Sequence, residues 1–123
     1  LFDDELILVS DKPMTAPDLG SSYIYVDHGE EFRRLHAAAY PGDTTSALTI
    51  ASSQWAIDHL LRSGGAGYIT SRHAKPLLAA GRLHRVPHAP NFTRRAYVVE
   101  LAQTTAAWPW FEAAIAAVRE TVP

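Results

Sequence analysis

The chain has 123 residues, a length typical of a single domain with one hydrophobic core. Its formal net charge of -2 and its scattered basic residues argue against the clustered basic face of a nucleic-acid-binding domain. The sequence has no cysteine and no apolar run near the roughly 20 residues of a membrane-spanning helix, which argues against disulfides, thiolate sites and membrane contact. Because the chain begins at Leu1 rather than at methionine, we expect it to be part of a longer polypeptide.

The first half of the chain alternates short apolar runs with amphipathic stretches, a pattern typical of strands that alternate with helices. Asp27 stands three residues before Glu30, the spacing of a capping box, and therefore predicts the start of a helix that the following Pro-Gly pair would stop. Ser52 and Ser53 follow a third apolar run and are predicted to cap the next helix. The strands predicted from these runs are residues 6–9, 23–26 and 48–51.

The most distinctive segment is residues 64–86, in which glycines alternate with short apolar runs. A phosphate-binding glycine loop follows a strand and opens a helix, but here helical spacing precedes Gly64 and strand-forming residues follow Gly67. Gly64 or Gly65 is therefore predicted to be the residue of positive φ that ends a helix. Pro76 is predicted to be the first residue of a further short helix.

The last third of the chain is predicted to contain strands at residues 83–87 and 95–101 and a helix that begins at Pro109 and covers the core. The alternation of strands and helices predicts an α/β fold with a largely parallel sheet and right-handed crossovers. The apolar residues of the terminal helix fall at helical spacing: Phe111, Ile115, Val118 and Val122.

Open parallel sheets bind ligands at the carboxyl ends of their strands, so we expect the binding residues there. No metal site is expected, because His84 and His88 fall on a strand and a proline-containing loop without further ligands nearby. No catalytic residue is expected, because Ser52 and Ser53 lack the glycines that flank a nucleophilic serine in a strand-to-helix turn. The candidate ligand-binding residues are Asp27, Ser52, Ser53, Gly67 and Tyr68.

Residues 65–72 read Gly-Ala-Gly-Tyr-Ile-Thr-Ser-Arg, and residues 77–86 read Leu-Leu-Ala-Ala-Gly-Arg-Leu-His-Arg-Val. In this order and spacing the segment resembles the effector-binding region of LysR-type transcriptional regulators. Residues 1–9 look like the strand that enters the second lobe of that region, and residues 96–99 look like the strand that leaves it. The resemblance covers essentially the whole chain.

The resemblance implies a three-layer, Rossmann-like lobe of the type 2 periplasmic-binding-protein fold, with a mixed, mostly parallel sheet and flanking helices. Residues 1–123 would form one domain, the second lobe with both crossing strands, without the winged helix and first lobe that lie upstream in the family. It further implies a cytoplasmic, non-catalytic sensor without a cofactor. Its partners would be a small, anionic effector between two lobes, DNA through the winged helix alone, and further copies of the full-length protein, with no membrane contact.

Two other classes of protein fit the same pattern. An extracytoplasmic solute-binding protein shares the two-lobe architecture, and the residues that precede Leu1 in the parent protein would distinguish the two, as a winged helix or a signal peptide. A small α/β enzyme would place its site near Ser52 or Ser53, and the missing glycines beside these serines argue against it.

Overall fold

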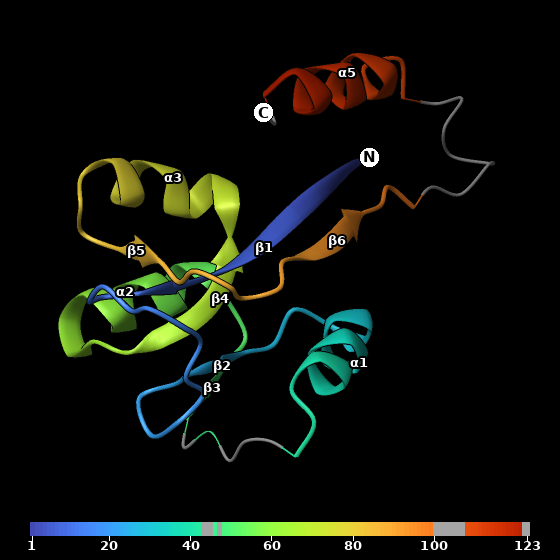
Figure 1. The fold of residues 1–123 in the computed structure, drawn as a ribbon. Coiled ribbons are helices and arrows are strands. Elements are labelled where there is room, and N and C mark those ends of the chain that lie inside the picture. Colours follow the sequence, from blue (N-terminus) through green and yellow to red (C-terminus); the bar gives the residue numbers. More distant parts are fainter. Residues whose placement is uncertain (43–45, 47, 100–107, 122–123) are drawn as a thin grey trace.

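The structure, a computed structural model, describes residues 1–42, 46, 48–99 and 108–121. Short helices and strands alternate through the middle of the chain (Figure 1). In chain order the elements are β1 (Phe2–Ser10), β2 (Tyr25–Val26), α1 (Glu30–Ala39), β3 (Thr49–Ile50), α2 (Ser53–Ser63), β4 (Ala66–Thr70), α3 (Ser71–Ala79), β5 (His84–Arg85), β6 (Phe92–Ala96) and α5 (Phe111–Thr121).

The long strand β1 forms the centre of the sheet and pairs antiparallel with β4, β5 and β6. It pairs with β4 along one edge, where Leu8 lies opposite Tyr68, and with β6 and β5 in succession along the other edge. The prediction of a mostly parallel sheet is therefore wrong. Residues 11–24 connect β1 to β2 without a helix, so no crossover forces the strands that follow β1 to run parallel to it.

Parallel pairing, within the described residues, is confined to the strands that helices connect. β2 and β3, joined through α1, are parallel, with Tyr25 opposite Thr49. A parallel bridge between Tyr23 and Ala66 ties this pair to β4, which follows α2. The sequence pattern thus predicts the direction of these three strands correctly, since a helix between neighbouring strands requires a crossover.

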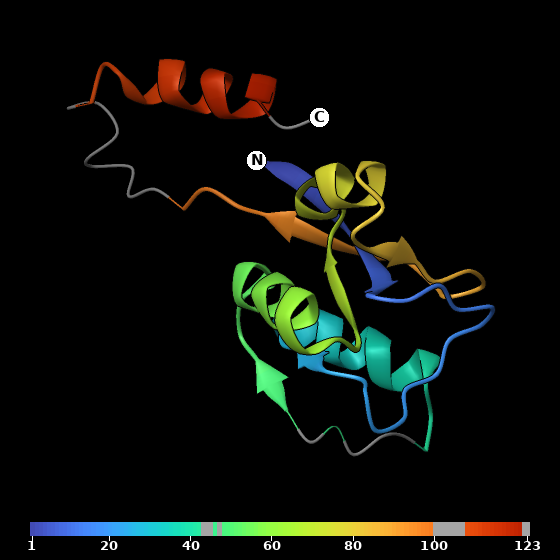
Figure 2. The same ribbon diagram turned by 90° about the vertical axis from the view of Figure 1, so that its left-hand side faces the viewer.

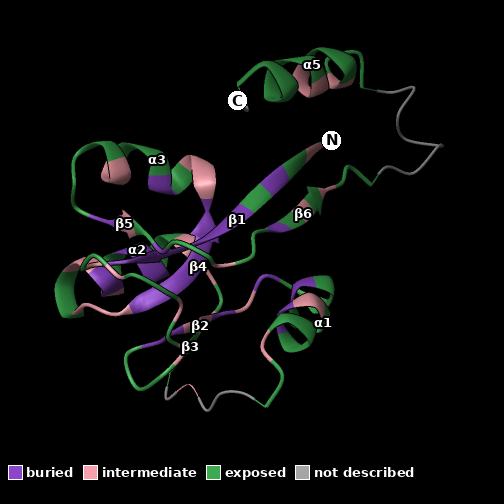
Figure 3. Cartoon of the chain, in the orientation of Figure 1, coloured by how far each residue is buried: buried purple, intermediate pink, exposed green. Residues whose placement is uncertain are grey.

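The sheet lies between α2 and α3 on one face and α1 on the other (Figures 1 and 2). Side chains alternate along β1, so Ile7 packs with Leu60 of α2 and Ala74 of α3, whereas Leu8 packs with Phe32 of α1. Figure 3 shows the buried residues concentrated in β1 and β4. The chain therefore has the predicted α/β architecture with helices on both faces of the sheet.

The predicted limits of α2 are confirmed, and so is the predicted end of α1 before Pro41 and Gly42, but the predicted start of α1 is wrong. Ser52 caps α2, where its Oγ accepts a hydrogen bond from the Trp55 N–H at 3.5 Å, and Gly64 ends the helix at φ 78°. The cap of α1 is Gly29 instead of Asp27. The Asp27 carboxylate accepts the Gly29 N–H at 3.0 Å, and this local turn moves the start of the helix two residues onward.

Pro76 lies inside α3 instead of at its start, because the helix already begins at Ser71. Proline lacks an N–H, so it cannot donate to the carbonyl one turn earlier, a loss that usually ends or bends a helix. Here Ala74 in the first turn is completely buried against the sheet, and partly buried Leu77 and Leu78 pack against the same core. Tertiary packing therefore keeps the whole segment helical.

The C-terminal elements differ most from the prediction. β6 ends at Ala96, residues 97–99 are exposed and outside any strand, and residues 100–101 lie outside the described residues. α5 has no buried residue from Phe111 to Thr121 and lies beyond the N-terminal end of β1 (Figures 1 and 2). The expectation that this helix covers the core is wrong, because α1, α2 and α3 already cover both faces of the sheet. Val122, which was predicted to belong to its apolar face, lies outside the described residues.

Candidate ligand-binding site

Three of the predicted binding residues lie together at one edge of the sheet, where β2 and β3 end. The Asp27 N–H donates to the Ile50 carbonyl at 2.8 Å, so the residue after β2 is held at the end of β3. Ser52 and Ser53 follow directly and, like Asp27, are partly exposed. We call these three residues the β2–β3 edge.

The charges at the β2–β3 edge favour α2 over α1 as a place for an anion. The first turn of α2 holds no acidic residue, so its backbone N–H groups and the positive end of its dipole are not offset by a carboxylate. The first turn of α1 holds Glu30 and Glu31, and Asp27 is already paired with Arg33 at 3.0 Å. Trp55, which is 69% exposed, adds an aromatic surface beside Ser52.

The other two predicted binding residues belong to the core, which corrects the expectation that they face a cleft. A Cβ at Gly67 would lie 2.8 Å from Cγ1 of Ile24, so glycine allows β2 to approach β4. The Tyr68 side chain is completely buried. Its hydroxyl donates to the Pro90 carbonyl at 2.8 Å and accepts from the Tyr40 hydroxyl at 2.6 Å, and burial, the largest influence, raises the pKa of Tyr68.

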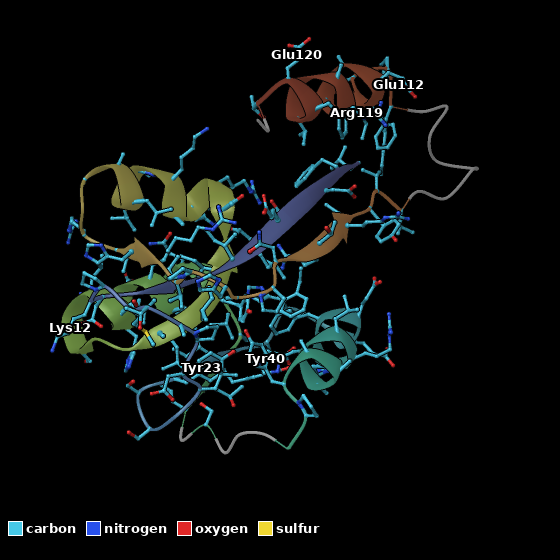
Figure 4. All side chains as sticks on the ribbon, in the orientation of Figure 1. Lys12, Tyr23, Tyr40, Glu112, Arg119 and Glu120 are labelled. Atoms are coloured by element: carbon cyan, nitrogen blue, oxygen red, sulfur yellow. The ribbon has the colours of Figure 1, made fainter. Side chains whose placement is uncertain are left out.

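The labelled side chains of Tyr23 and Tyr40 lie on the α1 side of the sheet (Figure 4). Tyr23 and Tyr68 belong to one buried cluster with Phe32 and Phe92, and Tyr40 packs against it. The rings of Tyr68 and Phe92 are 5.0 Å apart between centroids. Aromatic packing of this kind stabilises the layer between α1 and the sheet.

An ion-pair network that the sequence prediction missed joins β1 and β6 to α3. The Asp4 carboxylate, 5% exposed, accepts hydrogen bonds from Arg72 Nε at 2.9 Å and from an Arg94 terminal nitrogen at 3.2 Å. Asp4 shares its face of β1 with Leu6 and Leu8, which are buried. The alternation of Asp4 with these apolar residues could have predicted the network, because a carboxylate on the buried face of a strand requires cationic partners.

His28 links the β2–β3 edge to β4. Its side chain is 7% exposed, and its Nε2 lies 2.8 Å from the Tyr68 carbonyl. A carbonyl only accepts, so Nε2 carries the proton. Burial, the largest influence, outweighs this hydrogen bond and lowers the pKa of His28.

Acidification is expected to destabilise the fold through His28. Because its pKa in the folded chain lies below the ordinary value of 6.5, protons bind the unfolded chain more readily. The contribution of neutral His28 is fully present above pH 6.5 and is lost as the pH falls through the lower folded pKa. In His28→Gln, which keeps a donor for the Tyr68 carbonyl, urea unfolding should show a flatter decrease in stability between about pH 7 and pH 5. An equally steep decrease in the variant would contradict this assignment.

Within the described residues, neither a metal centre nor a serine nucleophile emerges at the β2–β3 edge. No group of three histidine, aspartate or glutamate side chains gathers as metal ligands within the part of the chain that the structure describes. Among those same residues, the hydroxyl of Ser52 serves the helix cap, and no histidine is hydrogen-bonded to Ser52 or Ser53. No described helix combines the length and apolar character needed to cross a bilayer.

Comparison with known proteins supports a regulatory-domain fold. No protein-family model matches the chain, and no curated protein sequence matches it. Among solved structures, the chain is similar to the regulatory domain of HypT, a LysR-type regulator, from Salmonella typhimurium, in its bromide-bound form. The TM-score is 0.64 at 11% identity, and the alignment covers 94% of this chain and 63% of that one. The chain thus has the fold of about two thirds of a regulatory domain.

Proposed function

We propose that the chain is an effector-sensing part of a LysR-type transcriptional regulator, and that residues 1–123 form the second lobe of the sensing region with both crossing strands. The likeness to the HypT regulatory domain carries this proposal, together with the family-like order of elements around residues 64–86. The part of the HypT domain without a counterpart here corresponds to the first lobe in this proposal.

The ligand in this proposal is a small anion held at the β2–β3 edge. The contacts from this lobe come from the positive dipole end of α2, which no acidic residue offsets, from the hydroxyls of Ser52 and Ser53 and from the exposed ring of Trp55. Asp27 orders the neighbouring turn through Gly29 and stands at the rim. The bromide ion in the HypT structure is likewise a small anion, which agrees with this choice.

Sensing then depends on closure of two lobes around the ligand. β1 and β6 pair antiparallel from Phe2 opposite Ala96 to Leu6 opposite Phe92, and these are the strands that would cross to the other lobe. A ligand shifts the closure equilibrium only if it binds the closed state more tightly than the open state. DNA contact belongs to a winged helix in the parent protein, and the regulator acts as a cytoplasmic, non-catalytic homo-oligomer without a cofactor.

The residues that precede Leu1 in the parent protein test the class of protein. We expect them to contain a winged helix followed by a first α/β lobe. A signal peptide at that place would instead favour an extracytoplasmic solute-binding protein and would contradict a role in transcription.

Two serine variants test the site in a polypeptide that carries both lobes. Ser53→Glu places a carboxylate at the start of α2 and should abolish the binding of small organic acids between the two lobes, measured by calorimetry. Ser63→Glu adds the same charge to the exposed last residue of α2 and should leave binding unchanged. If both variants bound small organic acids equally well, the N-terminus of α2 would not be part of the binding site.

A further inference from the structure

A concave region lies between α3 and the first half of β1. Its volume is about 410 Å³, within the range of small-molecule pockets. Figures 1 and 2 show α3 running alongside β1. None of Asp27, Ser52 and Ser53 lines it, so it is separate from the site proposed above. We call it the α3–β1 groove.

The two walls of the α3–β1 groove follow from the periods of a strand and a helix. β1 supplies one wall, with the carboxylates of Asp3, Asp4 and Glu5 followed by the buried apolar side chain of Ile7. Successive turns of α3 supply the other wall, from Ser71 and Lys75 to Leu78. The groove is therefore polar at one end and apolar at the other.

The charges around the groove are mostly paired with one another. Asp4 binds Arg72 and Arg94, Glu5 lies 3.7 Å from Arg85, and Asp3 lies 3.8 Å from Arg95. In the portion of the chain that the structure describes, Lys75 has neither an ion pair nor a side-chain hydrogen bond. The three carboxylates are thus neutralised by arginines, and the charge available to a ligand is the Lys75 ammonium.

We propose that the α3–β1 groove is a binding site for a small aliphatic monocarboxylate. The ligand carboxylate pairs with the Lys75 ammonium and accepts a hydrogen bond from the Ser71 hydroxyl, and its alkyl chain packs on Ile7 and Leu78. A ligand held there bridges α3 to β1, the strand that also pairs with β4 and β6.

Hexanoate is the probe for this site, and the amide chemical shifts of the ¹⁵N-labelled chain are the measurement. We expect saturable shifts at Ile7, Ser71, Lys75 and Leu78, with no matching shifts at the β2–β3 edge. Lys75→Met keeps the length of the side chain but removes its charge, and should weaken hexanoate binding about tenfold. The matched control is Lys12→Met, which changes the chain's other lysine; Lys12 is exposed, and Figure 4 shows it at the end of the molecule opposite to α5.

Two further probes separate charge from apolar contact. Propanoate should bind at least about fivefold more weakly than hexanoate, because it buries fewer methylene groups. Hexylammonium has a similar alkyl chain with the opposite charge and should not compete. Tighter binding of hexylammonium than of hexanoate, or unchanged hexanoate binding in Lys75→Met, would overturn the proposal. Shifts confined to Asp27, Ser52 and Ser53 would also overturn it while leaving the β2–β3 edge as a site.

Discussion

Gly65→Ala is expected to destabilise the fold by about 3 kcal/mol or more, because two separate costs add at this position. Gly65 has φ 116°, a conformation that residues with a side chain rarely adopt. A Cβ there would also lie 2.4 Å from the Ser22 carbonyl oxygen, which accepts the Ala66 N–H at 3.1 Å. The substitution therefore strains the backbone and separates the chain before β2 from the start of β4.

Gly81→Ala is the matched control, since Gly81 also has a positive φ, 72°, but a Cβ added there would meet no atom of the described residues within 4 Å. We expect this variant to lose only about 1 kcal/mol, the cost of the backbone conformation alone. Urea unfolding of both variants gives the comparison. Similar losses in the two variants would show that the contact with Ser22 contributes nothing.

Asp4→Ala is expected to cost about 2 to 4 kcal/mol, because it leaves the guanidinium groups of Arg72 and Arg94 facing each other without the buried carboxylate that holds both. Both arginines are partly exposed and regain some hydration, which keeps the loss below that of a completely buried pair. Thermal or urea unfolding measures the change.

Asp3→Ala, the neighbouring substitution, serves as the control for Asp4. The Asp3 side chain is 62% exposed and lies 3.8 Å from Arg95, so its removal should change the stability by less than about 0.5 kcal/mol. If both variants unfolded at the same urea concentration, Asp4 would not hold β1 and β6 to α3.

Local sequence signals predicted the parts of the fold that depend on local contacts. Ser52 as the cap of α2 and Gly64 as its end are both confirmed, because each acts within one turn of the helix. The same kind of signal failed at Asp27, where a carboxylate can bond either to the helix or to the nearer N–H of Gly29.

Long-range features could not be derived from the same signals. The direction of β1 relative to β4 depends on how residues 11–24 cross the molecule, and no period or cap encodes that path. α5 has the apolar spacing of a core helix, yet none of its residues from Phe111 to Thr121 is buried, because amphipathic spacing does not specify which surface a helix meets.

The candidate site could be predicted only in part, because local signals place only some of its residues. Residues directly after parallel strands meet at one edge by geometry alone, which brought Asp27, Ser52 and Ser53 together. Tyr68 lies within β4, and its aromatic neighbours come from α1 and β6, so its burial depends on contacts between distant segments.

The central claim is that this chain supplies one half of an anion-binding cleft. Titration calorimetry with a panel of small organic acids tests it, on the chain alone and on the polypeptide that adds the preceding residues of the parent protein. Both carry Lys75→Met, so that the α3–β1 groove does not contribute. We expect an acid that binds the longer polypeptide to bind the chain alone at least about a hundredfold more weakly, since half of the contacts are missing. Equal, tight binding by both would contradict the claim.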